Sequence, residues 1–223
     1  MHRRFADRLA GGRALAQYLT AYADRPDVVV LGLPRGGVPV AFAVAQALHA
    51  PLDVYLVRKL GVPGHEELAM GAIASGGVIA RNDEVIAGLC IPDRVLLSVV
   101  AREEQELARR EEAYRGDRPP PVLRERQVIL VDDGLATGAT MRAAVLAARR
   151  QGPAAVIVAV PVAPLQSCEE LRAVADAVVC AAMPEPFFAV GLWYEDFTPT
   201  SDEEVRRLLA RAAAPPAPAP QPG

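Results

Sequence analysis

Lysine is almost absent from this sequence of 223 residues, in which Lys59 is the single lysine beside 23 arginines. Such a bias indicates a general drift toward arginine, and a lysine that persists against it is a candidate for a role that a guanidinium cannot fill. The compact ammonium of Lys59 is therefore a candidate functional group. A surface lysine that persisted by chance is the alternative reading.

Cysteine and histidine are also scarce, with three residues of each. The cysteines are scattered and odd in number, which argues against a disulfide framework and favours a reducing cytoplasm. The equally scattered histidines make a zinc site improbable. A net charge of −3 gives no electrostatic case for binding nucleic acid or a membrane surface.

Long apolar runs are missing as well. Nothing reaches the roughly 18 consecutive apolar residues that a transmembrane helix needs. The opening residues 5–19 have the pattern of an amphipathic helix packed on the domain and not of a secretory leader. Residues 212–223 repeat alanine and proline without periodicity, which predicts a disordered tail outside the fold.

One stretch, residues 128–141, combines a buried strand with polar chemistry. Its apolar run Val128–Val131 is typical of a parallel strand, and Asp132 and Asp133 follow directly. Ligands of open α/β sheets bind at the C-terminal ends of the strands. A turn of mostly small residues comes next, whose backbone N–H groups are suited to a phosphate; it consists of Gly134, Leu135, Ala136, Thr137, Gly138, Ala139 and Thr140. Two acids beside an anion site suit a ribose 5-phosphate.

Strand and helix patterns alternate around this stretch. Further strands are predicted at residues 27–33, 52–57, 154–162 and 177–181, and helices at 38–50, 141–150, 165–175 and from 201 to about 211. The alternation requires right-handed crossovers and helices on both faces of the sheet. We predict a doubly wound α/β fold with a mostly parallel sheet and a small hood or accessory lobe.

The turn after the strand at residues 27–33 contains Arg35, Gly36 and Gly37. Adjacent glycines let backbone N–H groups face an anion, and a guanidinium is a bidentate phosphate donor. An ordinary strand-to-helix turn is the alternative. The strand at residues 52–57 is expected to deliver Arg58 and Lys59 to the same sheet edge, ahead of a mobile loop at residues 60–67.

Two further elements complete the middle of the chain. Residues 68–80 predict a β-hairpin that turns at residues 75–77. Residues 92–115 predict a long helix whose second half is almost wholly charged. That charged half is read as a solvated face with paired neighbours, or else as the surface of a homodimer.

The stretch Asp132-Asp-Gly-Leu-Ala-Thr-Gly-Ala-Thr140 resembles the 5-phosphoribosyl pyrophosphate (PRPP) motif of type I phosphoribosyltransferases. The resemblance implies that Asp132 and Asp133 hold the ribose hydroxyls and that Gly134 to Thr140 bind the 5-phosphate. It assigns Arg35, Gly36, Gly37, Arg58 and Lys59 to pyrophosphate, with a cis, non-proline peptide bond expected at Arg35-Gly36. Lys59, Arg35, Asp132 and Asp133 are the expected catalytic residues.

Residues 184–197 hold five of the eleven aromatic residues. Most are expected to pack on the core, but the resemblance to purine-salvage members implies that Phe187 or Phe188 stacks on the acceptor. It also implies that Asp196 reaches the water shell of Mg²⁺, which PRPP itself mainly holds. Ala136 stands where hypoxanthine-type members have an aspartate, as in adenine-type members. The likeness covers residues 27–60 and 128–182 and leaves the acceptor open.

These observations predict a single domain over residues 1–211. Its expected function is that of a cytoplasmic, Mg²⁺-dependent phosphoribosyltransferase of nucleotide salvage, which transfers 5-phosphoribosyl from PRPP to a small-molecule nitrogenous acceptor, a nucleobase, and releases pyrophosphate. The alternative is a PRPP-binding regulator without turnover. A dinucleotide-dependent oxidoreductase is disfavoured, because neither strand-to-helix turn has the Gly-x-Gly-x-x-Gly pattern.

Overall fold

A parallel sheet of five strands forms the centre of the structure, a computed structural model that describes residues 4–116 and 118–213, except for the side chains of residues 66 and 67. The strand order is β2-β1-β6-β7-β8, and every neighbouring pair is parallel. The strands are β1 (Val28–Gly32), β2 (Leu52–Val54), β6 (Gln127–Val131), β7 (Ala155–Val162) and β8 (Ala177–Ala182). The predicted doubly wound core is confirmed.

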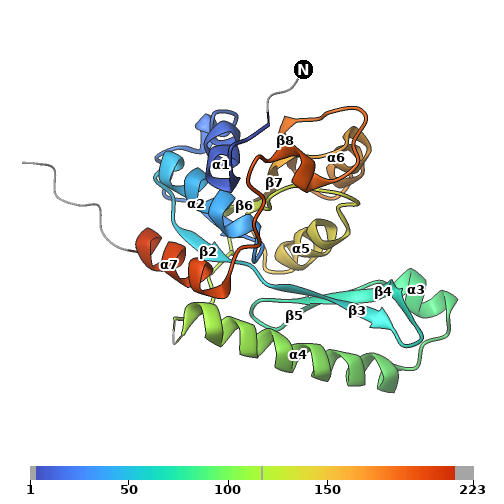
Figure 1. Cartoon of the computed structure of the whole chain (residues 1–223). Coiled ribbons are helices and arrows are strands. Elements are labelled where there is room, and N and C mark those ends of the chain that lie inside the picture. Colours follow the sequence, from blue (N-terminus) through green and yellow to red (C-terminus); the bar gives the residue numbers. More distant parts are fainter. Residues whose placement is uncertain (1–3, 117, 214–223) are drawn as a thin grey trace, which may run out of the picture.

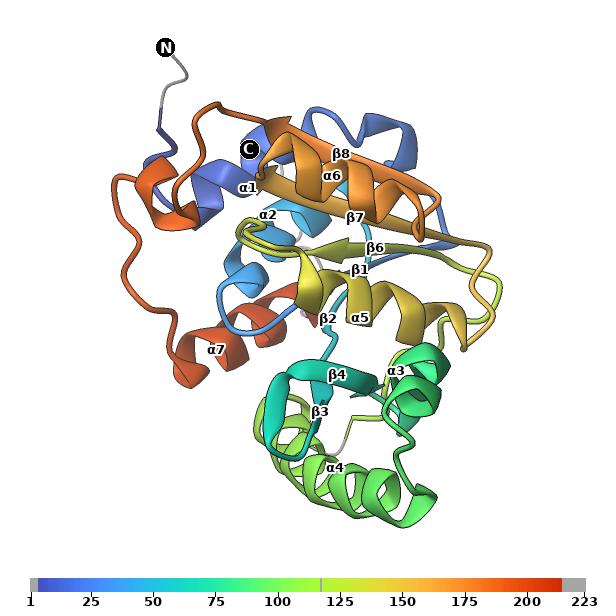
Figure 2. The ribbon, with the colours of Figure 1, turned by 90° about the vertical axis from the view of Figure 1, so that its right-hand side faces the viewer.

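Helices cover both faces of this sheet (Figures 1 and 2). Helices α1 (Arg8–Ala16) and α2 (Gly37–Leu48) pack on the face to which Val28 and Val30 point. Helices α5 (Ala139–Arg149) and α6 (Leu165–Arg172) pack on the opposite face, with Val29 and Leu31. Because side chains alternate along a strand, a continuous run of buried β-branched residues can fill two cores at once.

A second, antiparallel sheet lies beside the first and forms a separate lobe (Figure 2). Its strands are β3 (Val57–Val62), β4 (His65–Ala74) and β5 (Val78–Arg81), followed by helices α3 (Asp83–Gly88) and α4 (Asp93–Arg115). The C-terminal helix α7 (Asp202–Ala213) joins the apolar cluster of this lobe through Val205 and Leu208. The lobe therefore completes its core with a helix from the far end of the chain.

The predicted boundary between the third strand and its loop is wrong. Strand β2 ends at Val54, and Arg58 and Lys59 lie on β3 of the second sheet instead of at the end of a parallel strand. The segment 60–67, predicted as a loop without periodicity, is the tip of the β3–β4 hairpin. Register shifts beside Gly61 interrupt the alternation of the strand, which conceals its period-two pattern in the sequence.

Helix α4 confirms the predicted long helix, but its charged half is not simply a solvated face. Glu103 and Arg115 are buried. Arg58 Nη2 lies 2.6 Å from Glu103 Oε2, and Arg115 Nε lies 3.0 Å from Asp53 Oδ1. These ion pairs fasten α4 to β3 and to β2, so part of the charge run connects the two sheets.

Most of the remaining elements follow the predictions closely, although helix α3 was not predicted. The β4–β5 hairpin turns at residues 75–77, and a helix opens the chain at Arg8. The Ser201 hydroxyl accepts a hydrogen bond from the Glu204 N–H at 3.1 Å and caps α7, which continues through residues 212 and 213. The rest of the predicted tail, residues 214–223, lies outside the described residues. Throughout the described ranges, no helix combines the length and apolar character needed to cross a membrane.

Candidate functional site

Asp132 and Asp133 lie at the C-terminal end of β6, beside the turn that follows β1. Strands β1 and β6 pair in register from Val28 with Gln127 to Gly32 with Val131, so both strands end at the same level. The Leu33 N–H then donates to the Val131 carbonyl at 2.8 Å. The turn of residues 34–37 is thereby set directly against the two acids.

This contact explains both glycines of the turn. A Cβ added at Gly36 would collide with the carboxylate of Asp133, at 2.8 Å from its Cγ. A Cβ added at Gly37 would lie 2.6 Å from the carbonyl oxygen of Val131. The two predicted ligand-binding segments thus form one surface, and that surface tolerates no side chain at these two positions.

The acid pair is held in an unfavourable electrostatic environment. Burial and the charge of Asp133 raise the pKa of Asp132 well above its ordinary value, against the hydrogen bond from the Asp133 N–H at 2.8 Å. Burial also raises the pKa of Asp133, although Arg8 opposes this shift. Two adjacent carboxylates that must both accept hydrogen bonds from a sugar need a nearby cation to remain ionised.

Arg8 of α1 is that cation, and it was not among the predicted site residues. Its Nε donates to Asp133 Oδ2 at 2.8 Å, and the two side chains are only 11% and 16% exposed. Its Nη1 donates to the Thr198 carbonyl at 2.7 Å, and its guanidinium carbon lies 3.9 Å from the centroid of the Phe197 ring. Arg8 precedes Asp133 by 125 residues, and no local pattern signals the pairing.

Tyr194 is a second support that the sequence did not reveal. Its hydroxyl donates to the Asp133 carbonyl, and its ring stacks on Phe197 with centroids 5.2 Å apart. Tyr194 was expected only to pack on the core. It does so, and it also fixes the backbone of the acid pair.

The predicted phosphate turn, residues 134–140, is hydrogen-bonded to neighbouring elements on one side and exposed to solvent on the other. The Leu135 N–H donates to the Val162 carbonyl, and the Ser167 hydroxyl of α6 donates to the Ala136 carbonyl at 2.6 Å. Gly138 has a φ of +68° at the start of α5, a conformation that favours glycine. Exposed residues Ala136, Thr137, Ala139 and Thr140 surround the positive end of that helix.

The turn of residues 34–37 departs from prediction in one detail. Its cis peptide bond is Pro34-Arg35, one position earlier than expected. The Arg35 side chain is half exposed, with Nη1 3.8 Å from Asp202 Oδ1. Arg35 therefore lies at the mouth of the site and not against the acid pair.

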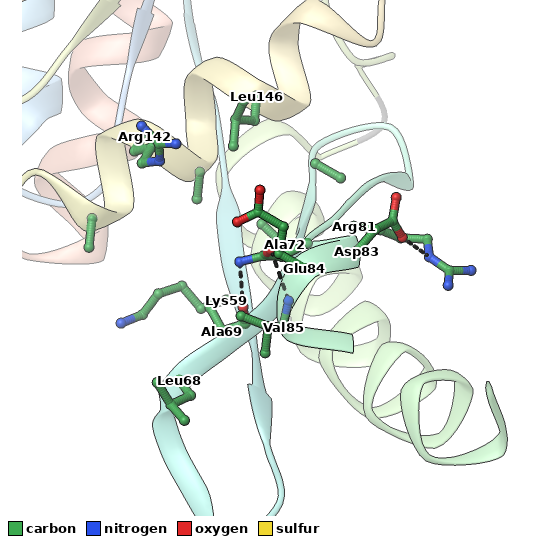
Figure 3. A pocket seen from close by; sticks show the side chains of 15 residues that line it. Lys59, Leu68, Ala69, Ala72, Arg81, Asp83, Glu84, Val85, Arg142 and Leu146 are labelled. Atoms are coloured by element: carbon green, nitrogen blue, oxygen red, sulfur yellow. Dashed lines mark hydrogen bonds and ion pairs between the residues drawn. The ribbon is translucent and has the colours of Figure 1, made fainter. Parts of the chain in front are cut away.

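Arg58 and Lys59 face the phosphate turn from the second sheet. Both line a cavity of about 350 Å³ that also includes Thr140. Lys59 further lines a larger cavity of about 580 Å³ between that sheet and α5. Figure 3 shows Lys59 and Arg142 toward one side of the larger cavity, while Arg81 pairs with Asp83 at the other. Lys59 thus lies in the groove between the lobe and the parallel sheet, although it comes from β3 and not, as predicted, from the end of a parallel strand.

The predicted acceptor residues lie on the opposite flank, after β8. Phe187 lines a cavity of about 650 Å³ with Pro164, Leu165 and Met183, whereas Phe188 is 78% exposed. Asp196 is exposed, and its Oδ1 accepts hydrogen bonds from the N–H and the hydroxyl of Thr198, which lower its pKa.

The carboxylates of the site suit Mg²⁺ only if a bound ligand supplies further oxygen atoms to the ion. Among the described residues, no group of three or more histidine, cysteine or acidic side chains could enclose a metal ion. Mg²⁺ commonly binds through one or two carboxylates, water and substrate phosphates. The paired carboxylates beside an anion site fit an ion that arrives with a phosphorylated substrate.

A paired-acid strand end, an open amide turn and a glycine loop at one sheet edge are typical of α/β proteins that bind phosphorylated ligands. The family model described as "Phosphoribosyl transferase domain" matches residues 5–195. The chain therefore belongs to the phosphoribosyl transferase family, and its resemblance to the type I members is confirmed.

A solved structure and two curated proteins are similar to this chain. The crystal structure of TT1426 from Thermus thermophilus has 43% sequence identity and a TM-score of 0.86, over 95% of this chain and 100% of that chain. Two curated Mycobacterium tuberculosis proteins, from strains H37Rv and CDC 1551, are each 50% identical over 208 residues and are named, provisionally, as phosphoribosyl transferases. These residues are 93% of this chain and 47% of each relative, so the chain spans about half the length of the curated relatives it matches.

Proposed function

We propose that this protein transfers the 5-phosphoribosyl group of PRPP to a nitrogenous acceptor, a nucleobase, and releases pyrophosphate. The observation that carries the proposal is the contact between the acid pair and the Gly36-Gly37 turn, beside the open turn at residues 134–140. This surface offers a carboxylate pair for ribose hydroxyls between two anion sites. In PRPP the ribose hydroxyls likewise lie between the 5-phosphate and the pyrophosphate.

In this mechanism the acceptor nitrogen forms a bond to C1 of the ribose while the bond from C1 to the pyrophosphate oxygen breaks. The electron pair of that bond leaves with pyrophosphate, and the proton on the acceptor nitrogen is released to solvent. Asp132 and Asp133 accept hydrogen bonds from the ribose hydroxyls and hold C1 in position. Lys59, Arg58 and Arg35 stabilise the negative charge that develops on the leaving group.

Mg²⁺ fits this site as a companion of PRPP, where it would neutralise pyrophosphate and orient the ribose hydroxyls. Asp196 is proposed to meet its water shell through the oxygen that does not bond Thr198. For the acceptor, the cavity beside Phe187 supports a stacking role for this ring. Phe188 remains a second candidate on the same segment. We further propose that residues 1–211 act as one cytoplasmic domain.

The test is pyrophosphate release from PRPP and Mg²⁺ across purine bases, pyrimidine bases and small amines, with the double variant Asp132→Asn/Asp133→Asn as control. Release that depends on one acceptor and disappears in the control would establish the transferase and identify its substrate. PRPP binding without release would instead support the regulatory alternative. A double variant with the wild-type rate would remove the acid pair from the mechanism.

A further inference from the structure

The charged half of α4 places one arginine inside the groove between the lobe and the parallel sheet. Arg110 lines a narrow pocket of about 40 Å³ with Leu33 and Pro34, which follow β1, and with Thr140, which ends the phosphate turn. Arg58 lines the same pocket. Helix α4 thus reaches both loops to which the proposed function assigns phosphate groups.

The guanidinium of Arg110 is positioned by its own helix. Its Nε donates to Glu106 Oε1 at 2.7 Å, and the side chain is 40% exposed. This hydrogen bond uses Nε and does not need the Nη1 and Nη2 end of the group. A guanidinium held at one edge is well prepared to present the other edge to an anion.

Other cations converge on the same place from separate elements. Arg58 reaches it from β3, where Glu103 holds its Nη2 at 2.6 Å. Arg110 and Arg35 both lower the pKa of Tyr114, although burial and the hydrogen bond to Asp202 raise it to about 12. Arg58 and Arg110 therefore line the same pocket, Arg35 lies close to Tyr114 and Asp202, and Lys59 lies in the adjoining cavity.

We propose that Arg110 is a pyrophosphate-binding residue that α4 contributes to the site. This inference rests on the proposed function, because the anion it binds is the pyrophosphate group of PRPP. The leaving group gains negative charge as its bond to C1 breaks, and a bidentate guanidinium is suited to stabilise that charge. The charge run of α4 then serves both as a connection between the sheets and as a wall of the site.

The neighbouring Arg109 provides a matched control. It pairs with the same carboxylate, through Nε at 2.8 Å and Nη2 at 2.9 Å, but its side chain is 66% exposed. Arg109 is not among the described residues that line the pocket. Arg109→Gln and Arg110→Gln each remove one charge and one ion pair with Glu106, but only the second alters the pocket.

The experiment measures calorimetric binding of inorganic pyrophosphate with Mg²⁺, together with kcat and KM for PRPP and the thermal midpoint. Arg110→Gln should weaken pyrophosphate binding about 10–100-fold, Arg110→Lys should recover part of it, and Arg109→Gln should bind as wild type does. Similar thermal midpoints for the two glutamine variants would exclude a folding effect.

Wild-type pyrophosphate affinity in Arg110→Gln would overturn the inference while leaving the proposed function intact. Equal losses in both variants would also overturn it, since they would show that the helix charge acts as a whole. Failure of the proposed function gives a different result, in which the wild type releases no pyrophosphate with any acceptor. The calorimetric comparison still decides the role of Arg110 in that event, because it requires no acceptor.

Discussion

Removal of the Arg8 side chain should destabilise the fold in a manner that depends on pH. In Arg8→Ala the carboxylate of Asp133 would stay buried beside Asp132 without its cation. Breaking a buried ion pair by removing one partner costs about 3–5 kcal/mol. The hydrogen bond to Thr198 and the contact with Phe197 are lost in the same step. For a chain of this size, about 3 kcal/mol corresponds to a fall of roughly 6–12 °C in thermal midpoint.

The pH dependence separates charge from packing. Arg8 lowers the pKa of Asp133, so without Arg8 this pKa rises further above its ordinary value. A protonated Asp133 no longer needs the cation. The loss of stability should therefore be largest near pH 8 and should shrink as the pH falls through the raised pKa of the variant.

Urea denaturation at about pH 8 and about pH 5.5 measures this effect, with Arg13→Ala on the exposed side of the same helix as the control. An equal loss at both pH values would show that Arg8 acts only by packing. A loss in Arg13→Ala as large as that in Arg8→Ala would assign the effect to the helix as a whole.

Three other variants test the site. Gly36→Ala should lower the free energy of unfolding by about 1–3 kcal/mol and weaken PRPP binding, because its methyl group collides with Asp133. The control Gly88→Ala has open space and should be neutral in denaturation and calorimetry. Unaltered PRPP binding in Gly36→Ala would refute the close contact. Lys59→Ala should lower kcat about 100-fold with a much smaller change in the Kd of PRPP, and the reverse pattern in steady-state and binding assays would indicate ground-state binding alone. Asp132→Asn should abolish PRPP binding yet raise the thermal midpoint. Because the folded state raises the pKa of Asp132, this acid stabilises the wild type fully below about pH 3.9. That stabilisation is lost as the pH rises, by up to about 1.4 kcal/mol per pH unit. A thermal midpoint of the wild type that stays unchanged from about pH 5 to about pH 8 would contradict the argument.

The parallel sheet was predictable because each of its central strands appears in the sequence as an apolar run bounded by turn residues. Residues 128–131 and 155–162 contain little besides β-branched and small apolar residues, and such runs fit only a sheet covered on both faces. The end of β2 was not predictable in this way. Tyr55 and Leu56 continue the apolar run past Val54, and both are buried, but the pairing with β1 ends with Gly32 and Val54. Beyond that point the Tyr55 N–H still donates to the Gly32 carbonyl, and the Leu56 N–H turns to the Ser75 hydroxyl. Pairing depends on the neighbouring strand, which the sequence does not show.

The site was predictable where its chemistry is contained in short motifs. The acid pair and the Gly36-Gly37 turn were each recognised locally, and the equal ends of β1 and β6 then bring them together. Arg8 and Tyr194 were missed because their roles arise from contacts across 125 and 61 residues of chain. Arg110 was concealed in a run of charged residues, where helical periodicity alone does not show which side chain faces the groove.

The two long-range contacts of Asp133 have a consequence for the order of assembly. Helix α1 precedes Asp133 in the chain, whereas Tyr194 follows every strand of the parallel sheet. Closing such long loops is entropically expensive, and contacts of this kind generally form late in folding. The sheet edge with its two acids can therefore exist in the growing chain before the acids have their full support. During synthesis, the acid pair therefore gains its full support only after the strands of the sheet have been made.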